Sequence, residues 1–549
     1  MKKLFLLLWV ATITLAGNLD LMAQPSKGGM PPSIALANEI TPGIDELVLP
    51  SINIYQALME DSINGREPLR VGKSIPVGYN MTNAGSWTDL PDGRRIWRLK
   101  LRSAGAVALA VVYDEFYIPE GGQLFLYNES RTQIIGAFDS ENNPENGNFS
   151  TEIIQGESVI LEYIEPRWEG ERPGRPIRVN GKVLGEVSDG SDFAKKQSTV
   201  PVLSIAEIVY IYKDVPQVMM FDQSRAPQFG ASEACEVNVR CSPAGDAWQD
   251  QRRGVAEIFL RIGASWYFCS GTLVNTTDNS EIPYFLTAYH CYEGATAADL
   301  NAWQFYFKYE SPTCANPGSS PAYSTITGCV LRAAGPIAGG SDFCLVELSS
   351  QPGMTYEPYY NGWDRTNYAW PATSVGIHHP AGDIKKISYC TSTLVASTPN
   401  IGGDVMGPNS AWRVIWGPTG NGTGVTEGGS SGSPLFNSAG RQVGTLSGGS
   451  SMCATPTDPD YYGAFWYHWD QNGTLASQRL QPWLDPGNTG WMSVNGFDPF
   501  STAKPATNFT AVDPATLLYP IPIFEGENVD YEDLSWGTPT SWSWSFPGG

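Results

Sequence analysis

All nine cysteines of this 549-residue chain lie between residues 230 and 495. Such clustering is typical of one unit that folds in an oxidising compartment and is cross-linked there. An odd number of cysteines leaves at least one thiol free or paired outside the chain. We therefore expect the region 230–495 to form one disulfide-bonded body. The nine residues are Cys235, Cys241, Cys269, Cys291, Cys314, Cys329, Cys344, Cys390 and Cys453.

Turn-forming and aromatic residues predict an all-β fold. The chain contains 58 glycines, 41 prolines, 18 tryptophans and 25 tyrosines, and Val, Ile and Thr recur in short runs. Residues 165–196 are charged and rich in Pro and Gly, which indicates an exposed connection. Before that connection, strands are expected at 95–102, 104–113, 123–127 and 158–163.

The composition excludes two classes of protein. Hydrophobic residues make up 42% of the chain and charged residues only 16%, which is too apolar for a disordered protein. The 34 basic and 56 acidic residues give a net charge of −22. Phosphate binding needs clustered Lys and Arg, so no nucleic acid partner is expected.

The first 23 residues have the pattern of a secretory signal peptide. Met1-Lys2-Lys3 is basic, and residues 4–16 form an apolar run of 13 residues. That run is shorter than the roughly 20 residues needed to span a bilayer. Ala23 supplies a small residue at the cleavage position. We therefore expect a secreted protein, extracellular or at the cell surface, with no transmembrane segment.

Three short segments of the cysteine region carry the residues of a nucleophilic site. An apolar strand ends at His290, Asp342 opens an alternating apolar run, and a glycine-rich turn at 428–432 presents Ser431. A serine becomes nucleophilic when an imidazole takes its proton and a carboxylate fixes the imidazole tautomer. Glycines beside the serine let backbone N–H groups converge on the developing oxyanion. The order His, Asp, Ser, at separations of 52 and 89 residues, is that of chymotrypsin-like proteases.

The same turn also fits the G-x-S-x-G motif of α/β-hydrolases, with Ser430 as the nucleophile. Asp458 or Asp460, and then His468, would complete that triad in the required order. Only 38 residues separate Ser430 from His468, which leaves no room for the strand–helix units that this fold needs between them. The α/β-hydrolase interpretation is therefore disfavoured.

The adjacent histidines His378 and His379 invite a metal-site interpretation. Adjacent histidines point in different directions, and no Cys or His cluster supports them with zinc-ligand spacing. We therefore expect both to be structural, and we expect neither a metal nor a cofactor.

Together these segments resemble the bacterial lysyl endopeptidases, which are chymotrypsin-like serine proteases. The resemblance is continuous over about residues 230–495 and weak over the region before them. It implies two packed antiparallel β-barrels with the active site in the cleft between them, and cleavage after basic residues, Lys first, with Arg left open. Besides the segments around His290 and Asp342, the matching motifs are CSGTLVN at 269–275, GWDR at 362–365, IHHP at 377–380, GVTEGGSSGSP at 424–434 and WLDPGNTG at 483–490.

The resemblance also implies catalytic roles. Ser431 would be the nucleophile, His290 the general base and Asp342 its orienting carboxylate, while the backbone N–H groups of Gly429 and Ser431 would form the oxyanion hole. Trypsin-like enzymes have an aspartate directly before the nucleophile, which pairs with a new N-terminus, but this chain has Ser430 there. We therefore expect activation by removal or displacement of a propeptide.

Specificity is expected to depend on a carboxylate after the nucleophile. The residue six positions before Ser431, where trypsin has its pocket aspartate, is Val425. Lysyl endopeptidases place this carboxylate later, in an Asp-x-Tyr-Gly segment, which here begins at Asp460. Ser447, at the place of a family histidine, and Gly448 are also assigned to substrate binding. The expected partners are peptides that contain Lys or Arg.

The same alignment suggests three disulfides, Cys235–Cys453, Cys241–Cys314 and Cys269–Cys291. The last of these would hold the loop that carries His290. Cys329, Cys344 and Cys390 have no inherited pairing.

The whole chain is expected to divide into five parts. Residues 505–549 resemble the first half of a polycystic-kidney-disease (PKD) type β-sandwich, which would be incomplete here and would associate with a surface or matrix. Residues 24–229 are interpreted as a propeptide that binds the protease, with a permanent binding domain as the alternative. The competing hypothesis for the whole chain is an inactive, protease-like surface-binding protein. The parts are a signal peptide at 1–23, the β-rich region at 24–229, the protease at 230–495, a linker at 496–504 and the PKD-like module at 505–549.

Overall fold

The computed structural model places side chains over most of the chain between residues 28 and 501. The expected signal peptide, most of the 165–196 connection and most of the PKD-like segment lie outside the described residues. The residues described are 28–36, 43–63, 68–144, 146–166, 200–213, 232–318, 321–367 and 373–501, together with the backbone of short strands within 178–183 and 509–533.

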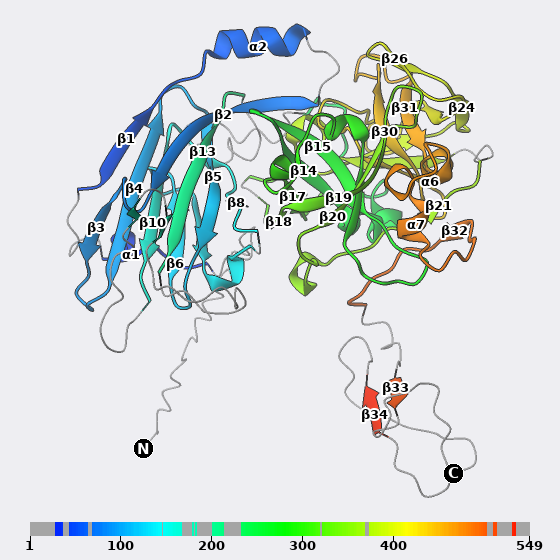
Figure 1. Cartoon of the computed structure of the whole chain (residues 1–549). Helices are drawn as coiled ribbons and strands as arrows, with labels where there is room; N and C mark the ends of the chain where they lie inside the picture. Colours follow the sequence, from blue (N-terminus) through cyan, green and yellow to red (C-terminus); the bar gives the residue numbers. More distant parts are fainter. Residues whose placement is uncertain are drawn as a thin grey trace, which may run out of the picture.

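The N-terminal unit is built from two facing layers of strands (Figure 1). Leucine and aromatic side chains from both layers form its core, including Trp97, Leu126 and Tyr210. One layer contains β1 (Asp45–Leu49), β3 (Ser86–Asp89), β4 (Arg95–Ser103), β6 (Gln123–Tyr127), β7 (Ile134–Phe138) and β10 (Ser158–Ile164). The other contains β2 (Leu69–Asn80), β5 (Ala108–Tyr117), β8 (Phe149–Ser150), β9 (Ile154–Gln155) and β13 (Val202–Ile211).

Strands β4, β6 and β10 confirm the expected strands at 95–102, 123–127 and 158–163. The expected strand at 104–113 is wrong at its start, because β5 begins only at Ala108. Residues 103–106 form a turn in which Ala106 N donates to Ser103 O at 3.4 Å, with Gly105 at a φ of 79°. The small residues of this turn directly precede the apolar residues of β5, so the sequence pattern did not separate the turn from the strand.

The cysteine-rich region contains two sheets, each with its own apolar core (Figure 1). The fold is all-β, as expected from the sequence. The first sheet contains β14 (Val255–Ile262), β15 (Ser265–Leu273), β16 (Tyr284–Thr287), β17 (Gln304–Phe307), β18 (Ser324–Thr327), β19 (Cys329–Gly335) and β20 (Phe343–Leu348). The second contains β21 (Trp363–Asp364), β22 (Ser374–His378), β23 (Lys386–Cys390), β24 (Val395–Ser397), β27 (Ala411–Val414), β28 (Trp416–Gly417), β29 (Pro434–Asn437), β30 (Gln442–Gly449), β31 (Asp460–Ala464) and β32 (Ser493–Val494).

Helices are short and lie around these sheets. Among the residues described, no helix is long and apolar enough to cross a membrane. The helices are α1 (Pro32–Ala35), α2 (Ile54–Ile63), α4 (Gln251–Gly254), α5 (Ala297–Leu300), α6 (Phe465–Asp470) and α7 (Gln481–Leu484). The remaining short strands pair as β11 (Arg178–Val179) with β12 (Lys182–Val183), β25 (Asn400–Ile401) with β26 (Asp404–Val405), and β33 (Phe509–Val512) with β34 (Asp530–Asp533).

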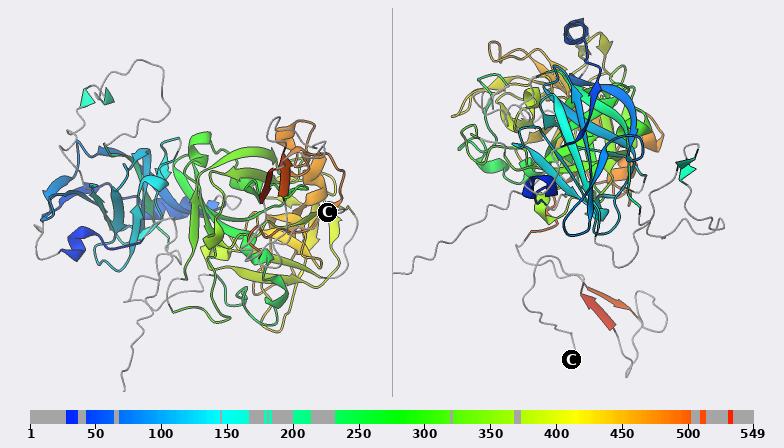
Figure 2. Two further views of the ribbon diagram at one scale, coloured as in Figure 1. Left: turned by 90° about the horizontal axis from the view of Figure 1, so that it is seen from below. Right: turned by 90° about the vertical axis from the view of Figure 1, so that its left-hand side faces the viewer.

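The N-terminal unit and the first protease sheet are joined edge to edge. Strand β2 pairs antiparallel with β15, from Lys73 opposite Ser265 to Leu69 opposite Phe268. One continuous sheet therefore runs from the N-terminal unit into the protease, and the two bodies lie side by side in both figures (Figures 1 and 2). Val71, Val209 and other residues of the N-terminal unit share a hydrophobic core with protease residues such as Trp266.

Glu152 lies buried in this junction. The Tyr323 hydroxyl donates to its Oε2 at 3.1 Å, and Tyr306 and Tyr356 are also near its carboxyl group. Burial raises the pKa of Glu152 to about 7, although the hydrogen bond from Tyr323 opposes this. The carboxyl of the unfolded chain has the ordinary pKa of 4.5. Between pH 4.5 and about pH 7, the folded protein therefore binds a proton that the unfolded chain has released.

We expect the stability of the joined units to fall as pH rises from about 4.5 to about 7. The Glu152 carboxyl would contribute about 3 kcal/mol to the free energy of unfolding below pH 4.5, and this contribution would be lost above pH 7. Urea unfolding at pH 5 and pH 7.5 measures the change. Glu152→Gln should reduce the difference between the two pH values, whereas the exposed Glu120→Gln should not. An equal pH dependence in wild type and Glu152→Gln would contradict the prediction.

Candidate active site

His290 and Asp342 are brought together by adjacent strand ends. Strand β16 pairs with β20, and Thr287 lies opposite Cys344, so the residues flanking these ends come close together. His290 follows β16 in a 3-10 turn, Tyr289–Cys291, while Asp342 directly precedes β20. The ring Nδ1 and the backbone N of His290 lie 2.9 Å from Asp342 Oδ2 and Oδ1, respectively.

This double contact defines the state of both side chains. Asp342 is fully buried, and burial alone would raise the pKa of its carboxyl. The charge and the hydrogen bonds of His290 outweigh burial and hold the Asp342 pKa below its usual value. An ionised Asp342 accepts Nδ1–H, which leaves Nε2 of His290 as the basic nitrogen.

The glycine-rich turn before β29 places Ser431 beside the His290 loop. Ser270 N donates to Ser431 O at 2.7 Å, and Cys291 Sγ lies 3.8 Å from the same oxygen. Gly432 has a φ of 82°, and a Cβ there would lie 2.1 Å from Thr287 Oγ1. Only glycine fits this position, because the turn crosses directly over the end of β16. The backbone thus joins the Ser431 segment to the His290 segment.

Two backbone N–H groups of the turn have no hydrogen-bond acceptor among the described residues. Within the described residues, neither Gly429 N nor Ser431 N donates a hydrogen bond to another protein atom. The carbonyl of Gly429 points elsewhere and accepts from Ser270 Oγ at 2.9 Å. Gly429 has a φ of 97°, and a Cβ there would lie 2.9 Å from His379 O. Both N–H groups are therefore available as donors.

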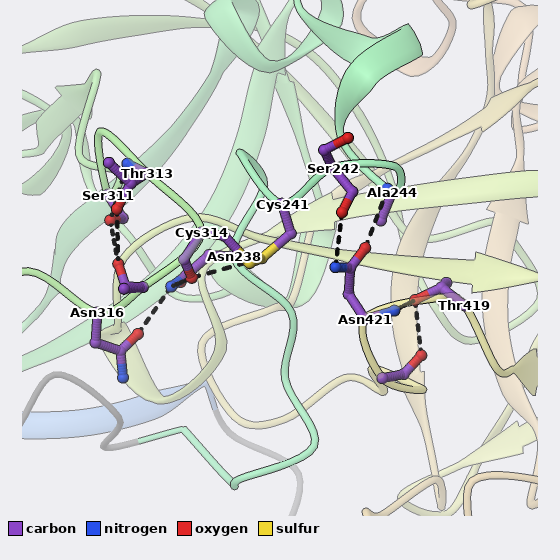
Figure 3. Close-up of a disulfide and its surroundings, with 12 residues drawn as sticks. Asn238, Cys241, Ser242, Ala244, Ser311, Thr313, Cys314, Asn316, Thr419 and Asn421 are labelled. Carbon is purple, nitrogen blue, oxygen red and sulfur yellow. Dashed lines mark hydrogen bonds between the residues drawn. A yellow bond between two sulfur atoms is a disulfide. The ribbon is translucent and has the colours of Figure 1, made fainter.

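The structure contains the three expected disulfides. Cys269–Cys291 anchors the His290 turn to β15. Cys241–Cys314 holds the 311–316 loop, where Asn238 Nδ2 also donates to Cys314 O at 2.9 Å (Figure 3). Cys235–Cys453 has the longest sequence separation. The remaining cysteines, Cys329, Cys344 and Cys390, are free and buried.

Asp460 begins β31 and lies buried behind the nucleophile loop. Three donors converge on its Oδ2: Trp416 Nε1 at 2.6 Å, Thr426 Oγ1 at 2.7 Å and Ser451 Oγ at 2.6 Å. On the other oxygen, Oδ1, Ser451 N donates at 3.2 Å. Burial raises the pKa of Asp460 despite these hydrogen bonds. A Cβ on Gly449 would lie 2.0 Å from Oδ1, so only glycine lets the neighbouring strand β30 pass this close to the carboxylate.

Sequence reasoning missed Trp416, Thr426 and Ser451. Thr426 lies five residues before the nucleophile, next to the position of trypsin's pocket aspartate, and that position could have identified it. Trp416 carried no local signal. The strand pairing of β27 with β31 and of β30 with β31 brings these segments around Asp460.

Ser447 and Gly448, both assigned to substrate binding from the sequence, lie near the end of β30. The buried hydroxyl of Ser447 is near Asp342 and helps to lower the pKa of that carboxyl. Gly448 follows it, partly exposed, with a φ of 140°. The side chain of Ser447 thus belongs to the His290–Asp342 pair, while Gly448 continues the same strand, β30, toward Asp460.

The other residues considered from sequence are separated by the fold. Ser430 Oγ contacts His378 at 2.8 Å, whereas His468 Nδ1 contacts Ser341 Oγ at 2.7 Å, so the α/β-hydrolase triad does not assemble. His378 and His379 are both fully buried. No group of three or more Cys, His, Asp or Glu side chains in the described part of the chain is arranged to hold a metal ion.

Comparisons with known proteins relate the chain to proteases. Residues 229–463 match the model of the lysyl endopeptidase C-terminal domain. Lysyl endopeptidase from Pseudomonas aeruginosa is 28% identical over 427 residues, covering 72% of this chain and 79% of the relative. The solved structure of the protease Anisep from Arthrobacter nicotinovorans is 20% identical, with a TM-score of 0.28, covering 39% of this chain and 90% of Anisep. The solved structure of the thermostable serine protease AL20, from an extremophilic microorganism, is 16% identical, with a TM-score of 0.27, covering 39% of this chain and 92% of AL20.

The chain is a serine endopeptidase, with peptide chains as its substrates. Within that class it is similar to the lysyl endopeptidases, over residues 229–463 for the family model and over 72% of the chain for the Pseudomonas relative.

Proposed function

We propose that the chain cleaves peptide bonds after basic residues, Lys first, through a Ser431–His290–Asp342 triad. The observation that carries the proposal is the pairing of His290 with a buried Asp342 beside a serine whose own N–H and that of Gly429 are unclaimed. Each chemical role in a triad mechanism thus has a residue in the correct neighbourhood.

The proposed reaction proceeds through an acyl-enzyme. Ser431 Oγ attacks the peptide carbonyl carbon while Nε2 of His290 takes the hydroxyl proton, and Asp342 stabilises the resulting imidazolium. The carbonyl oxygen becomes an oxyanion that faces the N–H groups of Gly429 and Ser431. His290 then returns the proton to the leaving amine, and the C–N bond breaks. A water molecule repeats the same steps on the ester and releases the acid.

Asp460 is proposed to select the basic side chain, with Gly448 as part of the substrate-binding strand. A buried carboxylate attracts a cation and penalises neutral side chains that leave it unpaired. The donors from Trp416, Thr426 and Ser451 orient Oδ2, and Oδ1 beside Gly449 is the oxygen proposed to meet the substrate cation.

Residues 24–229 are proposed to be a propeptide that must be removed or displaced. Its strand β2 begins at Leu69, and a Cβ on Gly428 of the nucleophile loop would lie 3.6 Å from Leu69 Cβ. A substrate approaching that side of the loop would meet the N-terminal unit. Secretion after cleavage of a signal peptide, and surface or matrix association through the PKD-like module, belong to the same proposal.

Peptidyl phosphonates that end in Lys or in Leu test the proposal directly. These reagents react covalently with an activated serine, and their rate depends on the residue bound in the specificity site. The processed protein should be labelled at Ser431, and at least about 100-fold faster by the Lys reagent than by the Leu reagent. Absence of labelling would contradict the triad, and equal rates would contradict the role of Asp460.

A further inference from the structure

The residue before the nucleophile, Ser430, is completely buried in a hydrogen-bond network of its own. Glu427 N donates to Ser430 Oγ at 3.1 Å, and Nδ1 of His378 lies 2.8 Å from the same oxygen. Trypsin-like enzymes have a carboxylate here that pairs with a charged N-terminus. In this chain the position is neutral, so another interaction must hold the loop.

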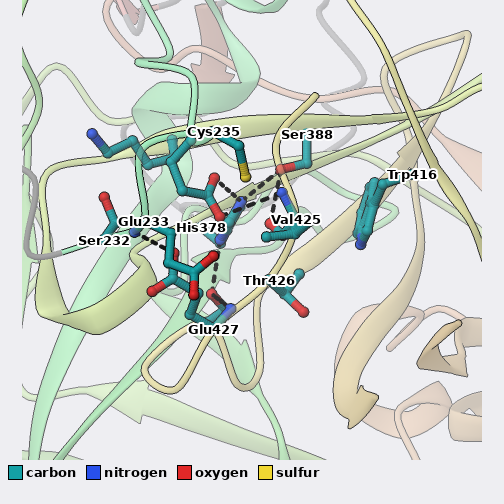
Figure 4. Close-up of polar contacts among 12 residues, drawn as sticks. Ser232, Glu233, Cys235, His378, Ser388, Trp416, Val425, Thr426 and Glu427 are labelled. Atoms are coloured by element: carbon teal, nitrogen blue, oxygen red, sulfur yellow. Dashed lines mark hydrogen bonds and ion pairs between the residues drawn. The ribbon is translucent and has the colours of Figure 1, made fainter. Parts of the chain in front are cut away.

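His378 continues the network to the other end of the loop (Figure 4). Its Nε2 lies 3.0 Å from Ser388 Oγ, and Ser388 Oγ donates to Val425 O at 2.9 Å. His378 ends β22 and Ser388 lies on the adjacent strand β23, so both come from the framework of the second sheet. The network therefore ties residues 425 and 430 of the loop to one rigid pair of strands.

The hydrogen bonds assign a single tautomer to His378. A hydroxyl has one proton, and that of Ser388 is committed to Val425 O. Ser388 must therefore accept from Nε2–H of His378, which leaves Nδ1 as an acceptor for the hydroxyl proton of Ser430. Ser430 in turn accepts from Glu427 N–H. Each donor in this series of hydrogen bonds has one acceptor, and none of the bonded groups is charged.

The groups around the imidazole also favour its neutral form. Burial, followed by the charge of Lys386, lowers the pKa of His378 to about 3. Glu236 Oε2 lies 3.8 Å from Nε2 of His378, while Glu236 Oε1 accepts from Val425 N at 3.3 Å. Burial and the neighbouring Glu427 raise the pKa of Glu236 well above its usual value. The raised pKa favours the uncharged form of Glu236, which adds no charge next to the ring.

We propose that Ser430 and His378 are positioning residues, which hold the 425–430 segment so that the N–H groups of Gly429 and Ser431 aim at the oxyanion. We call the series of hydrogen bonds Glu427–Ser430–His378–Ser388–Val425 the loop relay. It replaces the charged pair of trypsin-like enzymes with neutral hydrogen bonds between side chains and loop backbone. This inference rests on the proposed function and deepens it.

The loop relay is expected to act on the transition state and not on substrate binding. On the opposite side of the segment, Ala381 N donates to Gly428 O at 2.7 Å, and Ser270 Oγ donates to Gly429 O. Loss of the relay would free the 427–430 end of the segment from β22 and β23, whereas Val425 N would stay bonded to Glu236 and Thr426 Oγ1 to Asp460. The N–H groups of Gly429 and Ser431 would then lose their common direction. Two of the three donors to Asp460 Oδ2, Trp416 Nε1 and Ser451 Oγ, lie outside the 425–430 segment. Binding of the basic side chain should therefore be retained.

The experiment compares Ser430→Ala with Ser374→Ala in the processed enzyme. Ser374 is an equally buried serine at the start of β22, outside the loop relay. Ser430→Ala should lower kcat by about 10- to 100-fold and leave KM within about twofold. Removal of an oxyanion donor lowers kcat by about 10² to 10³, and a misplaced donor should have a smaller effect. Affinity for a peptidyl boronate, which forms a tetrahedral adduct with the serine, should fall by the same factor as kcat. Ser374→Ala should change neither.

Two further variants separate the relay from simple loss of packing. The amide of His378→Asn can reach the position of Nδ1, whereas that of His378→Gln reaches the position of Nε2. His378→Asn should therefore retain more kcat than His378→Gln. The double variant Ser430→Ala/His378→Gln should lose no more than its worse single variant, since both break one chain.

Some results would overturn the relay alone. These are an unchanged kcat in folded Ser430→Ala, a loss expressed only in KM, or fully additive losses in the double variant. If Ser430→Ala does not fold, the order of the two His378 variants decides: equal activity of His378→Asn and His378→Gln rejects the relay. A wild-type enzyme that forms no boronate adduct would instead reject the proposed function itself.

Discussion

Replacing Ser431 by alanine is expected to lower kcat/KM on Lys-containing peptides by a factor of about 10⁴ to 10⁶. The variant keeps the unclaimed N–H groups of Gly429 and of residue 431, but it has no atom to attack the carbonyl carbon. Residual hydrolysis then depends on water and on the oxyanion donors alone. Binding of substrate should persist, because Asp460 lies elsewhere and is held by its own donors.

The measurement requires the processed protein and a matched control. Ser438→Ala removes an exposed hydroxyl from the turn after β29 and should retain wild-type kcat/KM. His290→Ala should lose about as much activity as Ser431→Ala, and the double variant should lose no more, because the residues act as one unit. Substantial turnover by Ser431→Ala would contradict the assignment of the nucleophile.

Replacing Asp460 by asparagine is expected to lower kcat/KM on Lys substrates by about 10³-fold. The amide has the same shape as the carboxylate but no charge, so the substrate cation would be desolvated without a counter-charge. With its carbonyl oxygen turned to the donors from Trp416, Thr426 and Ser451, the amide would place its NH2 group at the Oδ1 position, where it would repel the substrate cation. Cleavage after Leu should change far less, because it makes no ionic contact with this position.

The informative quantity is the ratio of Lys to Leu cleavage in the same variant. Asp458→Asn is the control, because it makes the same chemical change two residues away at a partly exposed position. It should leave the ratio unchanged. An Asp460→Asn enzyme with the wild-type ratio would show that the specificity carboxylate lies elsewhere. Parallel assays with Arg substrates measure the Lys-over-Arg preference.

Much of the candidate site was predictable because its signals are local. His290, Asp342 and Ser431 each lie in a short motif with a characteristic strand or turn beside it. The flanking glycines identify the turn because only glycine fits the crowded backbone at positions 429 and 432. The order of the three motifs along the chain then selected the class of protease.

Other parts of the site could not be predicted because their signals are distributed. Trp416 reaches Asp460 across 44 residues, and His378 reaches Ser430 across 52. A histidine in an apolar strand looks the same whether it is buried without a role or linked to the nucleophile loop. The contact of the Ser447 side chain with Asp342 joins residues that are far apart in the sequence.

The sequence alone determined the all-β class and the three segments of the site, since alternation, turn residues and motif order are properties of neighbouring residues. The cysteine cluster predicted a protease at 230–495, but only the fold shows that its first sheet continues into the N-terminal unit. Strand β2 continues the protease sheet, and Val71 and Val209 share a core with Trp266. Strand pairing at an edge depends on which surfaces meet after each unit has folded, and no local pattern specifies that partner.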